Sequence, residues 1–215
     1  MTMGYTSMTK MTPISKKVKN GISYIYRAME ITRWQIFGKA LPDQTIADHS
    51  WGVCIILARI SDDLALDAYI SHNLQRYGLI HDTEEIYTGD MAHCIKKFVS
   101  VDGDQMRQIM HQRTSPAPGG LNMSFLDMDL EIGCTPKHLF KIADVMESAG
   151  WLNRFVDGTA KAHGSRASKV LKGTVSRLEV MIAEVPSGEA RDRLHQIMFE
   201  ILAPSDDLFE DLVLS

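Results

Sequence analysis

The chain has 215 residues, of which 45% are hydrophobic and 23% are charged, and its formal net charge is −4. This composition is ordinary for a globular protein and predicts a single domain with a sizeable apolar core. The basic residues are scattered, which argues against duplex DNA or RNA as a partner, because such binding relies on clustered Lys and Arg to displace counterions.

Cysteine usage and hydropathy indicate a cytoplasmic protein. Cys54, Cys94 and Cys134 are odd in number and form no C-x-x-C pair, which argues against a disulfide framework and against a thiolate zinc site. No stretch approaches the roughly 20 apolar residues of a membrane span, and the N-terminus lacks the apolar segment of a secretory signal. We therefore expect a soluble chain in a reducing compartment.

The first half of the chain is expected to form helices after a polar tail. Residues 1–13 are polar and lack any period, which predicts a mobile N-terminal tail. Apolar residues then recur at helical spacing, which predicts helices over about residues 14–30, 48–60 and 67–82. Asp48 is the expected N-cap of the second helix, and Gly38 and Pro42 predict a loop over residues 31–45.

The second half shows more interruptions but the same helical periodicity. A turn at Thr88-Gly89-Asp90 and a breaker over residues 115–120 precede a long helix that begins at Pro136. The helices expected here cover about residues 92–98, 104–113, 136–155, 174–184 and 189–202. Residues 158–173 are small, polar and basic, so they are expected to form an exposed loop.

These elements predict an all-α fold, because no segment alternates convincingly as a strand. We expect one helical bundle over residues 14–203, followed by a C-terminal tail over residues 204–215. The apolar face of the last helix allows two interpretations, either packing on a second subunit in a homo-oligomer or membership of the core, and we favour the core. That face consists of Leu194, Ile197, Met198 and Ile201.

His81-Asp82 is the first candidate for chemistry. The pair closes an apolar helix segment, where an unpaired carboxylate would be costly to bury. Neighbouring side chains on a helix diverge by about 100°, so the two can flank one cation but cannot surround it, and more ligands must come from other helices. Glu85 lies one turn beyond His81 and can reach the same face, to orient an attacking water or hold a second metal.

His49 and Asp144 are the two further candidates, because each is a polar residue associated with an apolar helix. Two imidazoles and two carboxylates suit Mn²⁺, Fe²⁺, Co²⁺, Ni²⁺ or Zn²⁺ and leave positions open for water and a phosphate oxygen. Taken singly, each residue has a plainer interpretation: His49 as a hydrogen-bonded core histidine, and Asp144 as one half of a buried salt bridge with Lys141. The residue types alone leave these alternatives open.

Five short segments, taken together, carry a resemblance to a known family. They span about residues 30–155 and read Thr32-Arg33-Trp34, Ala47-Asp48-His49-Ser50, His81-Asp82-Thr83-Glu84-Glu85, Thr88-Gly89-Asp90 with Lys96 behind it, and Lys141-Ile142-Ala143-Asp144. Their order and spacing resemble the HD-domain phosphohydrolases, and within them the deoxynucleotide-cleaving 5′-nucleotidases and the phage dATP triphosphohydrolases. A His-Asp pair alone is a weak signal, whereas this combination is specific. The resemblance implies an HD-domain helical bundle.

The resemblance implies a role for each residue of the candidate metal site. His49, His81, Asp82 and Asp144 would hold a catalytic divalent metal, which would be Mn, Co, Zn or Fe, with Mg as an option at a second site. Glu85 would position the nucleophilic water, and Asp90 would support that water or an additional metal. Asp90 also has a plainer explanation, since an aspartate often serves a turn of this kind.

The resemblance also implies a nucleotide site. Arg33 and Lys96 would grip phosphate oxygens, where cations neutralise the charge that develops during phosphoryl transfer. Trp34 would pack against the deoxyribose so that a ribose 2′-hydroxyl fits poorly, and Ile36 would offer an apolar wall to the base. The alternatives are that both cations are solvated at the surface, that Trp34 pins its loop to the bundle, and that Ile36 serves packing alone.

The implied reaction is metal-dependent hydrolysis of a deoxynucleotide to a deoxynucleoside plus phosphate or polyphosphate. One segment departs from the bacterial nucleotidases, which carry a proline-rich stretch after the Gly-Asp pair where this chain has Met91 to Ile95. We favour the phage-type reaction, dATP to deoxyadenosine and triphosphate, over a broad 5′-deoxynucleotidase acting on dNMPs. A phage-encoded enzyme of this kind would work in the host cytoplasm.

Two other functions compete with this interpretation. A phosphodiesterase of cyclic or dinucleotide substrates fits less well with Arg33 and Trp34. A non-catalytic HD scaffold, binding a nucleotide or a partner helix, would be favoured by the loss of a metal ligand, but the set is complete. The expected partner is therefore a small-molecule deoxynucleotide, with no duplex nucleic acid and no membrane.

Overall fold

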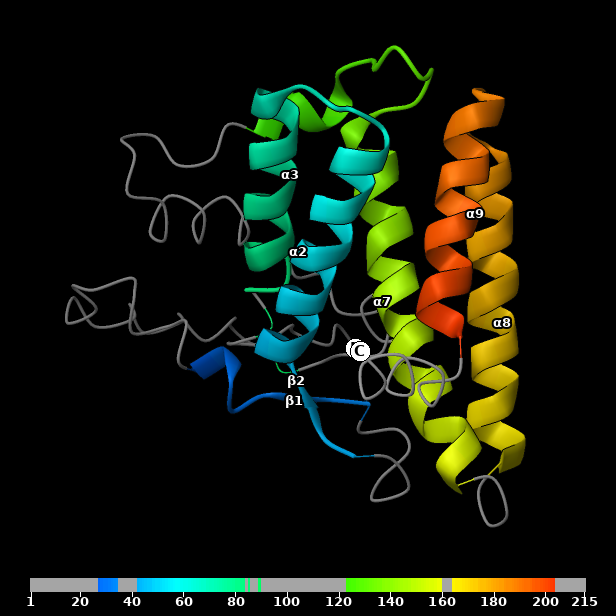
Figure 1. Ribbon diagram of the computed structural model, residues 1–215. Helices are drawn as coiled ribbons and strands as arrows, with labels where there is room; N and C mark the ends of the chain where they lie inside the picture. Colours follow the sequence, from blue (N-terminus) through cyan, green and yellow to red (C-terminus); the bar gives the residue numbers. More distant parts are fainter. Residues whose placement is uncertain are drawn as a thin grey trace, which may run out of the picture.

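The computed structural model describes residues 27–34, 42–83, 85, 89, 123–159 and 164–203 (Figure 1). The elements in these ranges are the strands β1 (Thr32–Arg33) and β2 (Gln44–Thr45), the helices α2 (Ile46–Asp63), α3 (Ala68–Ile80), α7 (Pro136–Thr159), α8 (Gly164–Ala183) and α9 (Gly188–Leu202), and the 3₁₀ helix η2 (Met123–Asp127). Five α-helices thus dominate the described part of the chain, which confirms the expected helical fold class.

The helices pack around α7, which contacts α2 and α3 on one side and α8 and α9 on the other (Figure 1). α2 and α3 form an antiparallel pair joined by a short turn, and their facing sides are apolar. The fully buried core residues of these helices include Val53, Leu57, Ile60, Leu74, Leu139, Ile142, Met146, Leu178, Ile182 and Leu194. Burial of this apolar surface is the main contribution that holds the bundle together.

The loop expected over residues 31–45 contains two short strands instead. β1 and β2 are antiparallel, with Thr32 opposite Thr45 and Arg33 opposite Gln44. Strands of two residues are too short to show alternation, so the sequence pattern gave no sign of them. Their pairing places Arg33 beside the start of α2.

The start of α2 also differs from the sequence expectation. The N-cap is Thr45 rather than Asp48, and the two residues form a capping box. The Thr45 hydroxyl accepts from the Asp48 backbone N–H at 3.1 Å, and the Asp48 carboxylate accepts from the Thr45 backbone N–H at 3.0 Å. The helix therefore begins at Ile46, and His49 lies in its first turn.

The ends of α3 agree closely with the expected helix over residues 67–82. Asp67 is the N-cap, and its carboxylate accepts from the backbone N–H groups of Tyr69 and Ile70. His81 is the C-cap, so Asp82 lies just beyond the helix. The His-Asp pair is thus held at a helix end that points toward the first turn of α2.

Helix α8 shows that the loop expected over residues 158–173 was a wrong prediction. α7 continues to Thr159, and α8 already begins at Gly164. Ala167 is buried and Val170 is partly buried, at helical spacing, and α8 packs along α7. Tertiary packing of this weak apolar stripe outweighs the low helix propensity of the Gly and Ser residues around it.

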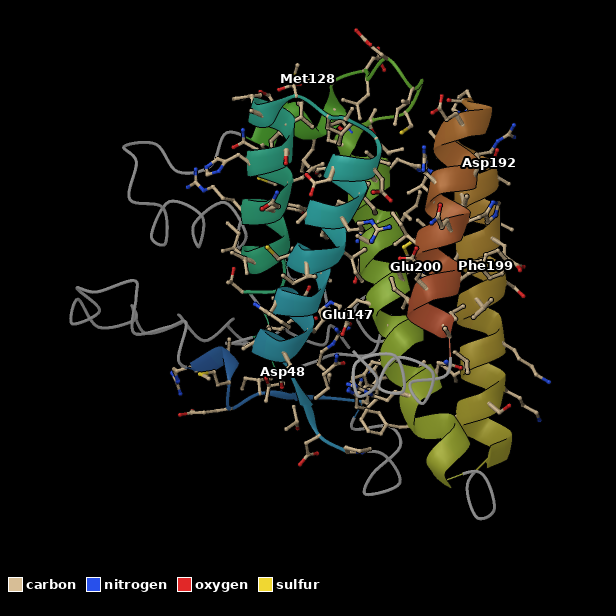
Figure 2. The ribbon with its side chains drawn as sticks, in the orientation of Figure 1. Asp48, Met128, Glu147, Asp192, Phe199 and Glu200 are labelled. Carbon is tan, nitrogen blue, oxygen red and sulfur yellow. The ribbon has the colours of Figure 1, made fainter. Side chains whose placement is uncertain are left out.

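The last helix contributes to the core, as favoured from the sequence. Leu194, Ile197 and Met198 are buried, and Ile201 packs against them from a partly buried position. The opposite face of α9 carries the exposed Phe199 (Figure 2). The core interpretation is therefore confirmed for the apolar face of this helix.

Several sequence expectations lie outside the described residues. They are the two terminal tails, most of the helix over residues 14–30, and the helices over residues 92–98 and 104–113. The domain limits at residues 14 and 203 thus stay a prediction. Cys54 and Cys134 are free thiols. Within the described ranges, no helix combines the length and apolar character needed to cross a membrane.

Gly78 on α3 is expected to be intolerant of a larger side chain, because a Cβ there would lie 2.8 Å from Leu57 Cδ1 and 3.4 Å from backbone atoms of Cys54. We expect Gly78→Val to lower the free energy of unfolding by about 1–3 kcal/mol through overpacking. Gly173→Val on α8 is the matched control, since a Cβ there meets nothing within 4 Å and the change in helix propensity is the same. Equal effects in urea denaturation would contradict the packing argument.

Candidate metal centre

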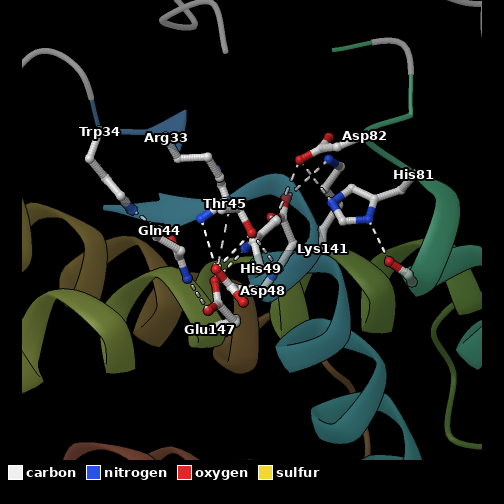
Figure 3. Close-up of polar contacts among 12 residues, drawn as sticks. Arg33, Trp34, Gln44, Thr45, Asp48, His49, His81, Asp82, Lys141 and Glu147 are labelled. Carbon is white, nitrogen blue, oxygen red and sulfur yellow. Dashed lines mark hydrogen bonds and ion pairs between the residues drawn. The ribbon is translucent and has the colours of Figure 1, made fainter. Parts of the chain in front are cut away.

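Three helices bring the four candidate ligands together. His49 comes from the first turn of α2, His81 and Asp82 from the end of α3, and Asp144 from α7. His49 Nε2 lies 3.2 Å from Asp144 Oδ1 and 3.6 Å from Asp82 Oδ2, and His81 Nε2 lies 3.2 Å from Asp82 Oδ2. One ligand atom each from His49, His81 and Asp82 lies within 4.8 Å of the others. Figure 3 shows His49, His81 and Asp82 of this group.

The two imidazoles are oriented by hydrogen bonds on their far sides. His81 Nδ1 donates to the Gly78 carbonyl at 2.8 Å, and His49 Nδ1 donates to the Glu147 carboxylate. Because both partners are acceptors, each Nδ1 carries a hydrogen and each Nε2 is left facing the carboxylates. Both Nε2 atoms are buried and have no hydrogen-bond partner among the described residues, although carboxylate oxygens lie close by.

This arrangement fits a divalent metal. Ionised carboxylates that face two imidazole nitrogens need a positive charge between them, which a proton or a metal ion can supply, and imidazole with carboxylate is a ligand set typical of Zn²⁺, Mn²⁺, Fe²⁺ and Co²⁺. Hydrogen bonds from the Nδ1 atoms to acceptors are the usual support for metal-bound histidines. The buried, unpartnered Nε2 atoms of His49 and His81 therefore have the surroundings that metal coordination requires.

The electrostatics of the site favour positive charge. Burial lowers the pKa of His49, but its contacts with Asp144 and Glu147 outweigh this and raise the pKa to about 9. Burial alone would raise the pKa of Asp82 and of Asp144. The imidazole of His81 reverses this for Asp82, and that of His49 does so for Asp144, so both carboxyls have pKa values well below their ordinary range. The carboxylates stay ionised and attract a cation.

Aromatic packing fixes the ring of His81. Phe140, on α7, meets the imidazole edge to face with ring centroids 5.0 Å apart, and Tyr77 packs against Phe140 at 4.6 Å. His49 meets His81 at 5.2 Å in a similar T-shaped arrangement. The side chain that ends α3 is therefore held by both α2 and α7, which limits its movement.

The two plainer interpretations are each partly correct. His49 is indeed a hydrogen-bonded core histidine, but only at Nδ1. Asp144 does pair with Lys141, at 3.5 Å through Oδ2, but that lysine is about half exposed. The other oxygen of Asp144 is the atom that faces His49. Neither contact uses the atoms that point into the candidate metal site.

Arg33 lies next to this site. Its Nη1 is 3.9 Å from a carboxylate oxygen of Glu147, and the side chain is only 14% exposed. Arg33 Nε and Nη1 are buried and find no hydrogen-bond acceptor among the residues that the structure describes. A buried guanidinium with spare N–H groups is suited to an anionic oxygen, which speaks against a solvated surface cation.

Trp34 is held rigidly. Its ring stacks on Trp151 of α7, with centroids 5.5 Å apart and planes 2° from parallel, and its Nε1 donates to Gln44 at 2.7 Å. Its backbone has φ +64°, a left-handed conformation that is strained for a bulky residue. A strained backbone of this kind persists only where surrounding contacts hold it in place, and it is often found at functional sites. The stacking does fit the interpretation of Trp34 as a staple to the bundle.

Glu85 is buried one turn beyond His81, and its backbone N–H donates to the Asp82 carbonyl at 2.9 Å. Gly89 continues this turn with φ +71° and donates to the Glu85 carbonyl at 2.8 Å. Asp90, Ile36 and Lys96 lie outside the described residues. The structure thus gives positions for seven of the ten predicted site residues, and their roles stay predictions.

Sequence reasoning missed three residues beside the site, namely Gln44, Glu147 and Trp151. Glu147 and Trp151 follow Asp144 by three and seven residues on α7, so they lie on the same helix face. That spacing could have predicted that both residues lie near Asp144. Gln44 gave none, because its contact with Glu147 depends on how the strand pair meets α7.

Comparison with known proteins agrees with this geometry. Residues 28–127 match the HD domain family. A dATP triphosphohydrolase of Acinetobacter phage SH-Ab 15497 is 24% identical over 209 residues, which cover 92% of this chain and 98% of that protein. The matched part of the chain therefore contains an HD domain. The resemblance found in the sequence is thereby confirmed.

Solved structures confirm the HD-domain fold. The cyanophage S-2L HD phosphohydrolase DatZ, bound to dA and one catalytic Zn²⁺ ion, aligns with a TM-score of 0.60 at 20% identity over 87% of this chain and 97% of its own. The PH0347 protein of Pyrococcus horikoshii OT3 aligns with a TM-score of 0.57 at 19% identity over 85% and 96%. The His/Asp cluster of the present chain has the residue types of a metal site.

The cluster predicts binding of Zn²⁺ or Co²⁺ that stabilises the fold. At a metal concentration of 100 Kd, the free energy of unfolding should rise by about 2.7 kcal/mol, because the ion binds the folded chain. We expect His81→Ala to abolish this gain in thermal or urea unfolding. His138→Ala is the control, since His138 donates to the Met181 carbonyl at 2.8 Å and takes no part in the cluster. Equal stabilisation by metal in all three proteins would contradict the assignment.

Proposed function

We propose that this protein is an HD-domain phosphohydrolase of deoxynucleotides, and that its favoured reaction is dATP to deoxyadenosine and triphosphate. The observation that carries the proposal is the meeting of two unpartnered imidazole nitrogens with two ionised carboxylates. Two relatives support the substrate class. One is named a dATP triphosphohydrolase and aligns along almost its whole length, and DatZ is bound to dA and one catalytic Zn²⁺ ion.

In this proposal His49, His81, Asp82 and Asp144 hold a divalent metal, which is Zn, Mn, Co or Fe, with Mg as an option at a second site. When bound, such an ion lowers the pKa of a water and polarises a phosphoryl oxygen. Glu85 follows the ligands on the next turn and is buried, which supports the proposal that it orients the attacking water. Asp90 would support that water.

Arg33 is the proposed phosphate-binding cation. Its guanidinium is largely buried, yet two of its nitrogens have no acceptor within the described part of the chain. A phosphate oxygen would supply the missing acceptor and is matched by the charge of the group. Glu147 lies 3.9 Å from Arg33 Nη1, which is too far for a hydrogen bond, so it attracts the guanidinium without satisfying either of these nitrogens. Lys96 would be the second cation.

Trp34 and Ile36 are the proposed walls for the sugar and the base. Stacking on Trp151 and the hydrogen bond to Gln44 hold the Trp34 indole in one orientation. A rigid aromatic wall can exclude a ribose 2′-hydroxyl by shape and by desolvation, without a polar contact. Ile36 would contribute apolar surface to the base.

A panel of dNTPs, dNMPs and ribonucleotides, assayed with Zn²⁺, Co²⁺ and Mn²⁺, tests this function. We expect dATP to be the best substrate and triphosphate to be the inorganic product. Asp82→Asn should reduce kcat/KM at least about 10³-fold, because the site loses a charged ligand. Release of phosphate from dNMPs would instead indicate a 5′-deoxynucleotidase. Nucleotide binding without turnover under any of these metals would indicate a scaffold.

Trp34→Ala is expected to relax the preference for deoxyribose. The ratio of kcat/KM for dATP to that for ATP should fall about tenfold, which corresponds to about 1.4 kcal/mol of discrimination. Trp34→Phe should keep most of the preference, because a phenyl ring still stacks on Trp151. Trp51→Ala on α2 is the control, since that side chain is 65% exposed. An unchanged ratio in Trp34→Ala would refute the sugar role.

A further inference from the structure

A chain of hydrogen bonds runs from Trp34, at the end of β1, to His49 on α2. The Trp34 indole Nε1–H donates to Gln44 Oε1 at 2.7 Å, and Gln44 Nε2–H donates to Glu147 Oε1 at 2.6 Å. The other carboxylate oxygen of Glu147 accepts from His49 Nδ1. Figure 3 shows these side chains in order from Trp34 through Gln44 and Glu147 to His49, and Figure 2 places Glu147 between α2 and α7.

The donors and acceptors allow this series of hydrogen bonds to have only one direction. An indole N–H can only donate, so it must meet the oxygen of the Gln44 amide. The amide nitrogen is then turned toward Glu147, whose carboxylate can only accept. The same carboxylate needs a donor from His49, which therefore keeps a hydrogen on Nδ1. The Nε2 atom of His49 is thereby directed at Asp82 and Asp144.

Because these groups are buried, a donor or acceptor left without its partner in this series of hydrogen bonds would be costly. Gln44 is 2% exposed and the Glu147 side chain is 10% exposed, so water cannot readily replace a lost partner. Gly52 on α2 adds a steric constraint, because a Cβ there would lie 2.8 Å from Glu147 Cγ. The carboxylate thus occupies a space that α2 leaves open only because residue 52 has no side chain.

We propose that Glu147 is a positioning residue, which Gln44 and Trp34 align so that it fixes the tautomer and ring orientation of His49. The inference rests on the proposed function, since it takes His49 as a metal ligand. Carboxylate partners of metal-bound histidines set the ring orientation and raise the basicity of the ligand, and their loss typically costs 10- to 100-fold in metal affinity. The same series of hydrogen bonds links Trp34, the proposed wall for the sugar, to the proposed metal site.

The test exchanges the amide and the carboxylate between positions 44 and 147. In Glu147→Gln the new amide can offer its oxygen to His49, but its nitrogen then faces Gln44. The Gln44 amide must turn to accept from it, and its own nitrogen then opposes the Trp34 N–H. We expect the affinity for Zn²⁺ and Co²⁺ to fall about 10- to 100-fold.

Gln44→Glu alone should also weaken metal binding, because it sets a second carboxylate where an N–H now lies 2.6 Å from Glu147. The double variant Q44E/E147Q matches every donor to an acceptor again. Its carboxylate at position 44 accepts from Trp34 and from the amide at position 147, whose oxygen accepts from His49 Nδ1. We expect it to recover most of the lost affinity. The Arg33 ion pair with position 147 is not restored, so recovery would be due to the order of donors.

Metal affinity is measured by competition with a chromophoric chelator. The absorption spectrum of the Co²⁺ protein reports ligand geometry, which a merely structural contribution of Glu147 would leave unchanged. Thermal unfolding in EDTA shows whether each variant folds without metal. Gly52→Ala is a second route to the same question, because it displaces Glu147 without changing any donor or acceptor, and it should weaken binding and alter the Co²⁺ spectrum.

Each outcome decides the inference. Weaker binding in E147Q with recovery in the double variant supports it. Native affinity and a native Co²⁺ spectrum in E147Q would overturn it and leave the proposed function intact. A double variant that binds as weakly as E147Q would overturn it as well, since charge beside His49 and not donor order would then matter. If the native chain binds neither ion, the proposed function fails and the inference fails with it.

Discussion

Burial of charge where α2, α3 and α7 meet is the constraint on which the rest of the structure depends. His49 is fully buried and faces the carboxylates of Asp82, Asp144 and Glu147. Groups of this kind are tolerated away from water only when each is paired, because an uncompensated buried charge costs several kcal/mol. The three helices therefore have to meet at this point. The apolar residues along their lengths supply the burial that holds them there.

Helix ends place the reactive groups, and the same local interactions place the residues proposed to bind substrate. Thr45 pairs with Thr32 in the strand pair and also caps α2, so one residue sets both the register of β1 and the first turn of the helix. His49 follows in that turn, while Arg33 is carried toward it by the paired strand. At the end of α3, the His81 ring is fixed by its hydrogen bond to the Gly78 carbonyl and by packing against Phe140. A small set of capping, strand-pairing and aromatic contacts thus positions His49, His81 and Arg33.

The sequence predicted the parts of this structure that depend on periodicity. The long apolar patterns placed α2, α3 and α7 to within a few residues, and apolar flanks singled out His49 and Asp144 before any contact was known. It could not predict the start of α8, where a weak stripe around Ala167 becomes helical only against α7. Nor could it predict the partners of His49, because Glu147 and Gln44 meet it only through the packing of α2, α7 and the strand pair. Contacts between distant segments are the part that local patterns do not contain.

If the chain has the proposed function, its substrate choice and its metal binding are coupled. The proposed metal ligands lie on packed helices or at the end of one, whereas Arg33 lies on a two-residue strand and Trp34 on the strained backbone that follows it. A short segment of this kind can change with little cost to the core. The hydrogen bond to Gln44 limits that freedom, because any residue at position 34 without an N–H leaves the buried Gln44 oxygen without its donor. The Gln44 amide is then free to turn, and the group that aligns Glu147 is lost. A substitution at Trp34 should for this reason also change the orientation of the His49 ring.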